Sequence, residues 1–466
     1  MADETPDDKP KLGVRGLSRT RRLRGSMRRY RYVSLSRRVW MRRAVFIAGA
    51  LLVGLAAVGF AGIANSAQDL YSYILTTYPM LPLVMTPACF AVLAYVTMRW
   101  FPAAAGSGIP QVIAARKSSD QVHVRALLGW QTTVAKIVMT ALALAAGASV
   151  GREGPTVQVG ASVMFAVATV AGLGRRNGFV LAGSAAGIAA AFNAPIAGIL
   201  FAIEELAKAF AGRINDIVIG SVVIAGAVSW AILGNYDYFG RVDADIVRMQ
   251  DWGAVPICAL FGGVLGGLFS VALVSLLRKP FGIVAVIKRQ SIIFAALCGL
   301  LVAILSIATA GYASGNGYAE TRASLIDGQA IPWWFGLAKL GSTLLSSASG
   351  IPGGLFSPSL AVGAGIGSMI TPIFTFADPR VIMLLMTVGY FAGVVQSPLT
   401  AVVIVMEMTS DKNMVIPLMA TSLFAAGISR LISREPIYHA LARGYYASVF
   451  RIHGTPDVSP GSPSGR

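Results

Sequence analysis

Gly151-Arg152-Glu153-Gly154-Pro155 places two ionisable residues between glycines in the middle of apolar sequence. Small and apolar residues fill the flanking stretches, 137–150 and 157–173. In the hydrocarbon part of a membrane such a break is tolerated only where the backbone packs in protein or lines a cavity. An ionisable residue at this depth marks a candidate functional site. The first question about this chain is therefore what the carboxylate of Glu153 faces.

The composition is that of an integral membrane protein. Of the 466 residues 55% are hydrophobic and 13% are charged, and the mean hydropathy is +0.67. A soluble domain carries about 25% charged residues. Apolar runs recur from residue 44 to 432, enough for on the order of ten to eighteen membrane segments. These runs lack the alternating pattern of barrel strands, so we predict an all-α polytopic membrane protein.

Positive charge is concentrated at the amino terminus. Residues 1–43 hold fourteen Lys and Arg against four Asp and Glu, which supplies +10 of the net charge of +18. Such an arm could bind nucleic acid. A basic segment beside a membrane span also follows the positive-inside rule and contacts anionic lipid. We favour the lipid bilayer as partner, with no nucleic acid, and we predict a cytoplasmic amino terminus.

Enzymatic chemistry is not indicated by the sequence. The cysteines are isolated in apolar stretches and the histidines form no ligand cluster, so we predict no metal, disulfide or cofactor. Ser184 and the scattered histidines leave an intramembrane hydrolase as a remote alternative. No zinc-binding His-Glu-x-x-His motif and no serine elbow occurs at a break. His439 also has no partner that the sequence can place.

The membrane part is an internal repeat with an offset of 203 positions. One pairing at a fixed spacing would be chance, but many at the same spacing indicate two related halves. The offset pairs Gly151 with Gly354, Pro155 with Pro358, Lys136 with Lys339, Pro195 with Pro398 and Glu204 with Glu407. Repeated halves with Gly/Pro-interrupted segments at matching positions are typical of transporters with a site near the membrane midplane.

The breaks at 151–155 and 353–358 are expected to meet at that site. A broken helix offers unpaired backbone N–H groups and the positive end of its dipole, which favours an anion. The glycines allow the backbone to approach an ion, and the following proline fits a first helical turn. The sequence therefore predicts an anion pathway that contains a carboxylate.

Three motifs occur together: Gly-Ser-Gly-Ile-Pro at 106–110, Gly-Arg-Glu-Gly-Pro at 151–155 and Gly-Gly-Leu-Phe-Ser-Pro at 353–358. Together they resemble the anion-site motifs of the CLC chloride channel and transporter family, in the same order and across nearly the whole membrane part. The resemblance implies two inverted-topology halves with tilted, broken and re-entrant helices. It also implies a homodimer in which each subunit has its own pore.

The resemblance assigns the residues of an anion path. Ser107 matches a serine whose hydroxyl coordinates the central anion, and serine here implies chloride rather than nitrate as the preferred ion. Tyr438 matches the tyrosine partner of that serine. Backbone amides complete the path, at the central site from Leu355 and Phe356 and at the outer site from Arg152, Glu153, Gly154, Phe356 and Ser357.

The resemblance also assigns proton-handling residues. Glu153 matches the gating glutamate, whose carboxylate competes with the anion and moves aside once it is protonated. Glu205 matches the internal glutamate that exchangers use to pass protons and that channels usually lack. Glu204 would be an auxiliary on that route, and Lys136 matches a buried lysine that offsets negative charge near the pathway.

Each of these assignments has a structural alternative. Glu153 could form an ion pair with Arg152, and Glu205 could be a helix-end charge at the membrane interface. Ser107 could be an ordinary turn residue, Tyr438 an interfacial anchor, and Lys136 a lysine whose charge reaches the interface.

The predicted organisation is a basic cytoplasmic arm (1–43), a first membrane repeat (44–235), a connecting loop (236–250), a second repeat with a C-terminal helix (251–440) and a disordered cytoplasmic tail (441–466). No soluble carboxy-terminal domain is expected, as in a bacterial-type member in the cell (inner) membrane. The predicted function is exchange of chloride for protons by a secondary active transporter. A passive, gated chloride channel on the same scaffold is the alternative.

Overall fold

A computed structural model describes residues 37–452 of the chain, with short gaps. The internal residues that it leaves out are 174–175, 208–215, 235–237, 243, 245, 247, 279, 281, 328–330, 375–376 and 412. Most of the predicted basic arm, up to position 36, therefore lies outside the described residues. The same holds for the predicted tail from position 453 onward.

The described residues are almost entirely helical, as predicted, with two isolated β-bridges. The first half contains α2 (Arg37–Thr77), α3 (Pro82–Arg99), η1 (Pro102–Ala104), α4 (Ile109–Lys117), α5 (Gln121–Leu128), α6 (Trp130–Ala145), α7 (Glu153–Val170), α8 (Arg176–Phe192), α9 (Pro195–Phe201), η2 (Ala202–Ala207) and α10 (Asp216–Leu233). The second half contains η3 (Met249–Gly253), α11 (Ala254–Arg278), α12 (Gly282–Lys288), α13 (Ser291–Ala308), α14 (Tyr318–Asp327), α15 (Phe335–Ala348), α16 (Phe356–Ile370), η4 (Thr371–Ile373), α17 (Pro379–Val395), α18 (Pro398–Thr409), α19 (Val415–Ile432) and α20 (Ile437–Ile452).

Among the described residues, seven helical stretches are long and apolar enough to cross a membrane. They are Arg43–Thr77, Pro82–Arg99, Gln121–Ala145, Met249–Arg278, Ser291–Ala308, Phe356–Ile373 and Val415–Ile432. Several shorter apolar helices, α8, α10, α17 and α18, lie between them. The protein is therefore a multi-pass membrane protein that mixes full-length spans with shorter helices.

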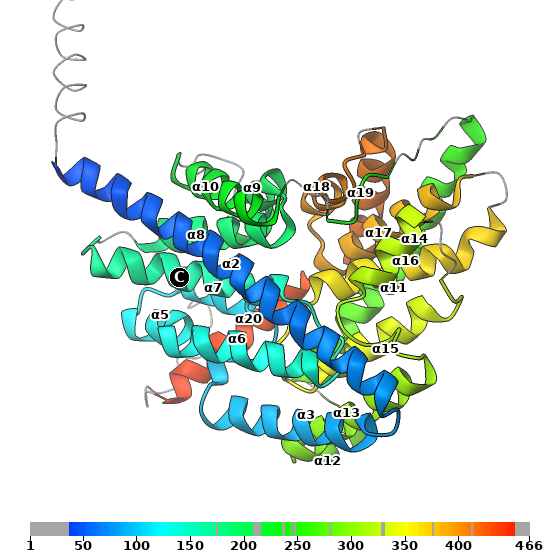
Figure 1. The fold of residues 1–466 in the computed structure, drawn as a ribbon, viewed down its shortest axis with the longest axis horizontal. Helices are drawn as coiled ribbons and strands as arrows, with labels where there is room; N and C mark the ends of the chain where they lie inside the picture. Colours follow the sequence, from blue (N-terminus) through cyan, green and yellow to red (C-terminus); the bar gives the residue numbers. More distant parts are fainter. Residues whose placement is uncertain are drawn as a thin grey trace, which may run out of the picture.

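The repeat is visible in the packing of two helix pairs. In the first half α7 packs along α8, and in the second half α16 packs along α17 (Figure 1). Gly160 of α7 lies against the backbone of α8, and Gly363, 203 positions later, lies against the backbone of α17 in the same way. Small residues at such contacts let membrane helices approach closely, because lipid provides no hydrophobic force between them.

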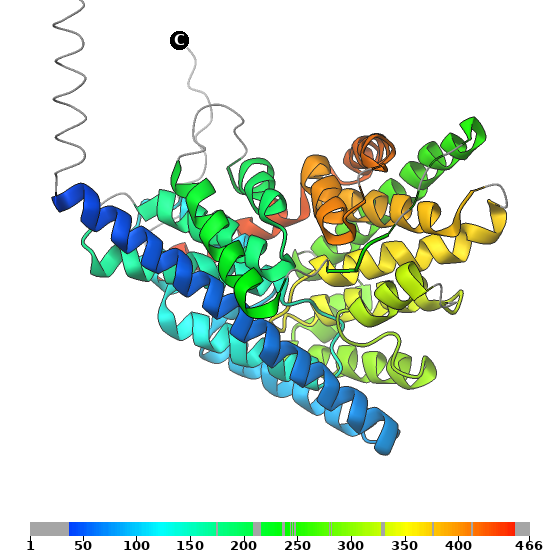
Figure 2. The same cartoon turned by 45° about the horizontal axis from the view of Figure 1, so that its top comes forward.

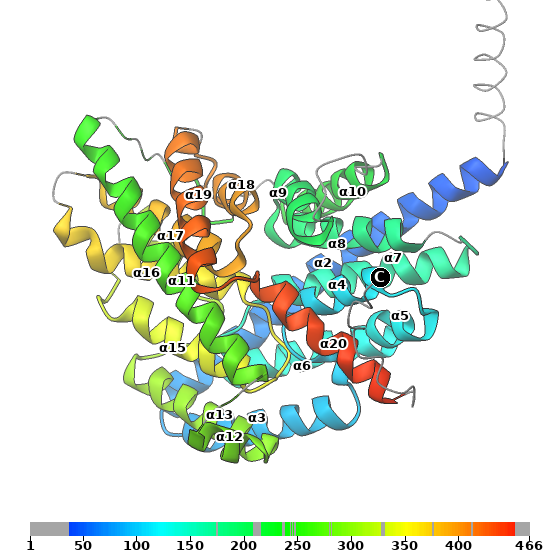
Figure 3. The ribbon, with the colours of Figure 1, turned by 180° about the vertical axis from the view of Figure 1, so that it is seen from behind.

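The two halves lie side by side and are connected at their edges. Figure 2 shows the blue-to-cyan helices on one side and the yellow-to-orange helices on the other. At one edge α3 of the first half packs on α13 of the second. At the back α20 leaves the second half and runs beneath the first, where it packs on α4 (Figure 3). This return of the last helix places Tyr438 near residues of the first half.

The predicted boundary at residue 440 is wrong, because it lies inside α20. This helix continues to Ile452, through residues that were assigned to a disordered tail. The reason is its packing: the hydroxyl of Tyr445 donates to the carbonyl of Ala105 at 3.1 Å, and that of Tyr446 donates to the carbonyl of Ile113 at 3.5 Å. At the other end, α2 begins at Arg37, inside the predicted arm.

Candidate functional site

The three Gly/Pro breaks meet at one point between the halves. The backbone N–H of Gly151 donates to the carbonyl of Gly354 at 2.8 Å, and the N–H of Gly354 donates back at 2.7 Å. The N–H of Gly353 donates to the carbonyl of Gly106 at 3.1 Å. The predicted meeting of the breaks at 151–155 and 353–358 is therefore confirmed, and the break at 106–110 joins them.

Each break leads directly into a helix. Helices α4, α7 and α16 begin at Ile109, Glu153 and Phe356, and in none of the three does the N-cap side chain make a capping hydrogen bond. An α-helix leaves its first N–H groups without intrahelical partners and has a partial positive charge at this end. Three such helix ends that start from one backbone junction provide a favourable setting for an anion.

The backbone at this junction is tightly packed. A Cβ added at Gly154 would lie 2.8 Å from the carbonyl oxygen of Ser107 and 3.3 Å from Cα of Gly354. A Cβ at Gly151 would collide with the carboxylate of Glu153. At Gly154 the backbone itself blocks a side chain, whereas a side chain at Gly151 would displace the carboxylate of Glu153.

Glu153 is fully buried and faces the second half of the chain. The hydroxyl of Tyr238 lies 3.4 Å from Oε1 of Glu153, to which it donates, and 3.3 Å from the hydroxyl of Ser357. The neighbouring Arg152 is less closely engaged, with Nε 4.0 Å from Oε1 of Glu153. Its guanidinium instead donates to α2, to the carbonyl of Ala61 at 2.8 Å and to Oδ1 of Asn65 at 2.6 Å. The arginine is thus bound mainly to the scaffold rather than to the glutamate.

A cavity of about 420 Å³ lies beside this carboxylate. Arg152 and Tyr238, which both approach Glu153, form part of its wall. The other lining residues are Val58, Ala61, Gly62, Asn65, Leu233, Asn316 and Tyr318. Its lining contains one cationic group and several neutral hydrogen-bonding groups, a composition that suits a small anion.

Ser107 and Tyr438 are both buried. Oγ of Ser107 accepts a long hydrogen bond from the N–H of Ile109, at 3.4 Å. The hydroxyl of Tyr438 has no hydrogen-bond partner among the described residues, although it is inaccessible to solvent. A buried hydroxyl without a partner is costly, so its presence fits a site where a further acceptor is bound.

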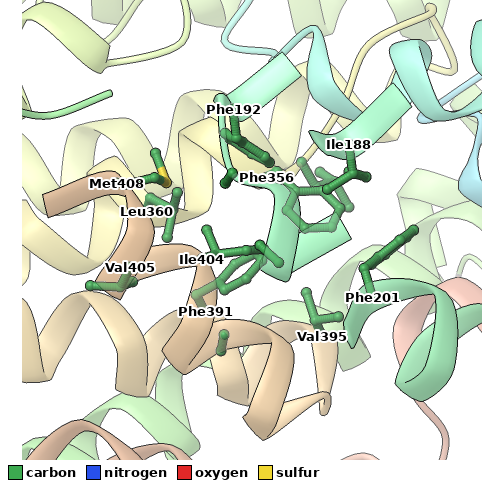
Figure 4. Close-up of a cluster of buried hydrophobic side chains, with 14 of the residues drawn as sticks. Ile188, Phe192, Phe201, Phe356, Leu360, Phe391, Val395, Ile404, Val405 and Met408 are labelled. Atoms are coloured by element: carbon green, nitrogen blue, oxygen red, sulfur yellow. The ribbon is translucent and has the colours of Figure 1, made fainter. Parts of the chain in front are cut away.

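The rings around Phe356 close the space beneath the junction. Figure 4 shows Phe356 among Phe192, Phe201 and Phe391, which come from α8, α9 and α17. The ring centroids lie 5.0 to 6.0 Å from that of Phe356. The ring of Tyr438 stacks on Phe356 with centroids 5.9 Å apart and planes 13° apart. Phe356, the first residue of α16, therefore lies in a cluster of aromatic rings.

Glu205 is the other buried glutamate among the described residues, at 1% exposure, in the π-helical stretch η2. The hydroxyl of Ser397 donates to its Oε2 at 2.7 Å. Nε2 of His439 lies 3.1 Å from the backbone carbonyl of Glu205 and 3.6 Å from its Oε1. Short π-helical turns within helices are frequent at functional sites.

Sequence comparison agrees with this geometry. A profile described as voltage gated chloride channel matches residues 88–430, which is well over half of the chain. The chain belongs to the voltage-gated chloride channel (CLC) family. The match includes all three breaks and Glu205, but it ends before Tyr438.

Solved structures share the CLC fold with this chain. A slow cyanobacterial Cl⁻/H⁺ antiporter is 24% identical with a TM-score of 0.76, covering 87% of this chain and 97% of its own. A CLC-type fluoride/proton antiporter is 20% identical with a TM-score of 0.71, covering 84% of this chain and 96% of its own. A eukaryotic CLC transporter is 21% identical with a TM-score of 0.69, covering 87% of this chain and 74% of its own.

Lys136 of this CLC chain is fully buried and binds backbone carbonyls. Its ammonium donates to the carbonyls of Ala104 and Gly106, both at 2.7 Å, and to that of Ala105 at 3.3 Å. Lys339 repeats this arrangement in the second half with the carbonyls of Ala313, Ser314 and Gly315. Lys136 therefore holds the loop that leads into Ser107, and it does not reach the membrane interface.

Three residues of the CLC site were not found from the sequence: Tyr238, Ser397 and His439. Ser397 lies in a predicted break, but nothing in the sequence connected it with Glu205. His439 was expected to have no placed partner, and the structure corrects this, because it contacts Glu205. Among the described residues, no group of three or more His, Cys, Asp or Glu could hold a metal ion.

Proposed function

We propose that the protein is a secondary active transporter that exchanges chloride for protons. The observation that carries this proposal is the pair of buried carboxylates, Glu153 at the backbone junction and Glu205 in η2. A passive chloride pathway needs no second buried carboxylate. The CLC family consists of transporters and channels rather than enzymes, and two of the structures with the same fold are proton-coupled antiporters.

The anion path runs through the junction. Chloride at the central site accepts from the hydroxyls of Ser107 and Tyr438 and from the backbone N–H groups of Leu355 and Phe356. At the outer site it accepts from the N–H groups of Arg152, Glu153, Gly154, Phe356 and Ser357. The uncapped starts of α7 and α16 and the buried hydroxyl of Tyr438 support this assignment.

Glu153 is the gate and carries the proton on the outer side. As a carboxylate it competes with chloride for the same positive helix ends, because both are anions. When it takes a proton it loses its charge, leaves the helix ends and admits chloride. When Glu153 later releases that proton toward the opposite side of the membrane, it is a carboxylate again and blocks the path. Chloride movement is thereby coupled to proton movement.

Glu205 takes protons from the cytoplasmic side by a branch separate from the anion path. Its contacts with Ser397 and His439 support a fixed orientation of the carboxylate. Glu204 assists on this branch, and Lys136 supports the loop before Ser107. No cofactor takes part, since proton transfer and anion binding need only these side chains and the backbone.

The remaining parts of the proposal concern the membrane, the topology and the assembly. We place the protein in the cell (inner) membrane with both termini cytoplasmic, so that the basic arm contacts anionic lipid. It acts as a homodimer with one pore in each subunit. The apolar outer faces of α10 and α19, with exposed Trp230 and Phe424, are consistent with burial in lipid or against a second subunit.

Proteoliposomes test the exchange directly. Vesicles loaded with high chloride are diluted into a low-chloride buffer that contains an impermeant anion, and external pH and chloride are recorded together. Valinomycin with equal potassium on both sides holds the voltage near zero. We expect chloride efflux to drive proton uptake into the vesicles, and a protonophore to abolish the pH change. Chloride efflux without proton movement would overturn the exchanger and establish the passive channel.

A further inference from the structure

Glu204 of the first half reaches into the second half. Its Oε2 accepts from the backbone N–H of Thr400 at 2.7 Å and from the hydroxyl of Thr400 at 2.8 Å. Its Oε1 accepts from the N–H of Leu399 at 3.3 Å. These donors belong to the first turn of α18, which begins at Pro398. The carboxylate therefore caps a helix that is distant in the sequence.

Glu407 makes the reciprocal contact. It lies near the end of α18, and its Oε1 and Oε2 accept from the N–H groups of Ile196 and Ala197 at 3.0 and 2.6 Å. These two residues form the first turn of α9, which begins at Pro195. Helices α9 and α18 pack against each other and lie next to each other in two views (Figures 1 and 3).

The two contacts are related by the internal repeat. Glu204 and Glu407 are 203 positions apart, and so are the prolines that begin α9 and α18 and the capped residues after each of them. Neither helix has a capping hydrogen bond from its own N-cap side chain. The caps come from the opposite half, so each half completes a helix of the other.

Both carboxylates supply acceptors where the start of a helix needs them. The first-turn N–H groups have no intrahelical acceptor, and the helix dipole adds a partial positive charge. The hydrogen bonds that an ionised carboxylate accepts from these N–H groups are stronger than those of a neutral acceptor. Both oxygens of Glu204 are engaged in this way, an arrangement that opposes its use as a mobile proton carrier.

We propose that Glu204 and Glu407 form a reciprocal clasp that locks the two halves together, and that Glu204 acts on the proton branch as a positioning residue. Ser397, the N-cap residue of the helix that Glu204 holds, donates to Oε2 of Glu205 at 2.7 Å. By fixing the start of α18, Glu204 fixes the donor that orients Glu205. This second part rests on the proposed proton role of Glu205.

The test compares Glu204→Gln with Glu407→Gln, its repeat-related control. Glutamine keeps one acceptor oxygen but places an NH₂ group against a backbone N–H. Each variant therefore weakens the contact of one glutamate and leaves that of the other intact. We expect each to lower the melting temperature of the full-length protein in detergent by about 2 °C or more. In proteoliposomes Glu204→Gln lowers the proton-to-chloride ratio as Ser397→Ala does, whereas Glu407→Gln leaves that ratio unchanged.

Thr400→Val is a milder variant that removes only the hydroxyl donor to Glu204. It keeps the proposal testable if a glutamine variant does not fold, and we expect a smaller fall in melting temperature with a reduced proton-to-chloride ratio. If Glu204→Gln and Thr400→Val both leave the melting temperature unchanged, the clasp is wrong. If Glu204→Gln slows protons while Ser397→Ala has no effect, Glu204 is a carrier. If the wild-type protein moves no protons, the proposed exchange function is wrong. The melting temperatures of the variants still test whether the two glutamates hold the halves together.

Discussion

The two buried glutamates occupy different positions in their helices, and this difference fits the different roles proposed for them. Glu153 is the first residue of α7, and its Oε1 accepts a hydrogen bond from the hydroxyl of Tyr238. Glu205 lies in η2, where the side chains of Ser397 and His439 hold it. A carboxylate at the start of a helix can compete with an anion for that helix end, whereas Glu205 lies inside a helical stretch rather than at its start.

Replacing Glu153 tests the gate. In Glu153→Ala no carboxylate remains to occupy the helix ends or to carry a proton, so we expect chloride flux to continue and proton transport to fall to the level of protein-free liposomes. Simultaneous recording of chloride and pH in proteoliposomes measures both. Glu435→Gln, at a carboxylate whose side chain is 40% exposed, is the control and should keep both fluxes. Proton pumping by Glu153→Ala would show that the coupling group lies elsewhere.

Tyr238 offers a subtler change at the same carboxylate. Tyr238→Phe keeps the ring but removes the hydroxyl that contacts Glu153 and Ser357. A net hydrogen bond contributes about 0.5–1.5 kcal/mol, so the carboxylate should leave its position about two- to twelvefold more readily. We therefore expect faster chloride turnover with an unchanged fold. Turnover equal to that of the wild type would mean that this hydroxyl does not hold the gate.

At the scale of elements, the site depends on how closely the starts of the helices approach one another. Gly106, Gly151, Gly353 and Gly354 join the breaks through backbone hydrogen bonds. A Cβ added at Gly353 or Gly354 would lie within 3 Å of atoms of the first half. The helix that follows each break begins without a cap from its own N-cap residue. The geometry of the anion path is therefore set by backbone, with side chains added at its edges.

Gly154→Ala tests this close approach. The added methyl group would lie 2.8 Å from the carbonyl of Ser107, so the start of α7 must shift. Overpacking of this kind costs about 1–3 kcal/mol, and we expect a lower melting temperature together with weaker chloride binding by calorimetry. The control is Gly427→Ala in α19, where a Cβ would meet nothing within 4 Å. Normal chloride binding by Gly154→Ala would show that the junction tolerates movement.

The breaks could be predicted from the sequence because glycine, proline and charge are local signals. Their meeting could also be predicted, since the repeat relates one break to the other. Tyr238 could not, because the segment that carries it is held by contacts far away in the sequence, such as the N–H of Phe239 donating to the carbonyl of Met408 at 2.9 Å. His439 and Ser397 were missed for the same reason: each reaches Glu205 across more than 190 positions.

At the scale of the whole molecule, the repeat conserves scaffold contacts and varies the chemistry. The offset of 203 relates Lys136 to Lys339 and Glu204 to Glu407, and in each pair the structure shows equivalent contacts with backbone groups. At the same offset, the counterpart of Glu153 in the second half is Phe356. Two similar halves thus share these backbone contacts, while only the first half has a carboxylate at the position of the proposed gate.

Variants of the two buried lysines test which contacts serve only the scaffold and which also affect the site. Lys136→Met and Lys339→Met each leave three carbonyls without their donor, and a buried group that loses its partner costs about 1–3 kcal/mol. We expect both variants to lose melting temperature by similar amounts, while Lys117→Met, at the exposed end of α4, loses little. Only Lys136→Met should also bind chloride more weakly by calorimetry, because the loop it holds leads directly into Ser107. Equal chloride affinity in the two core variants would mean that Lys136, like its counterpart, serves the frame alone.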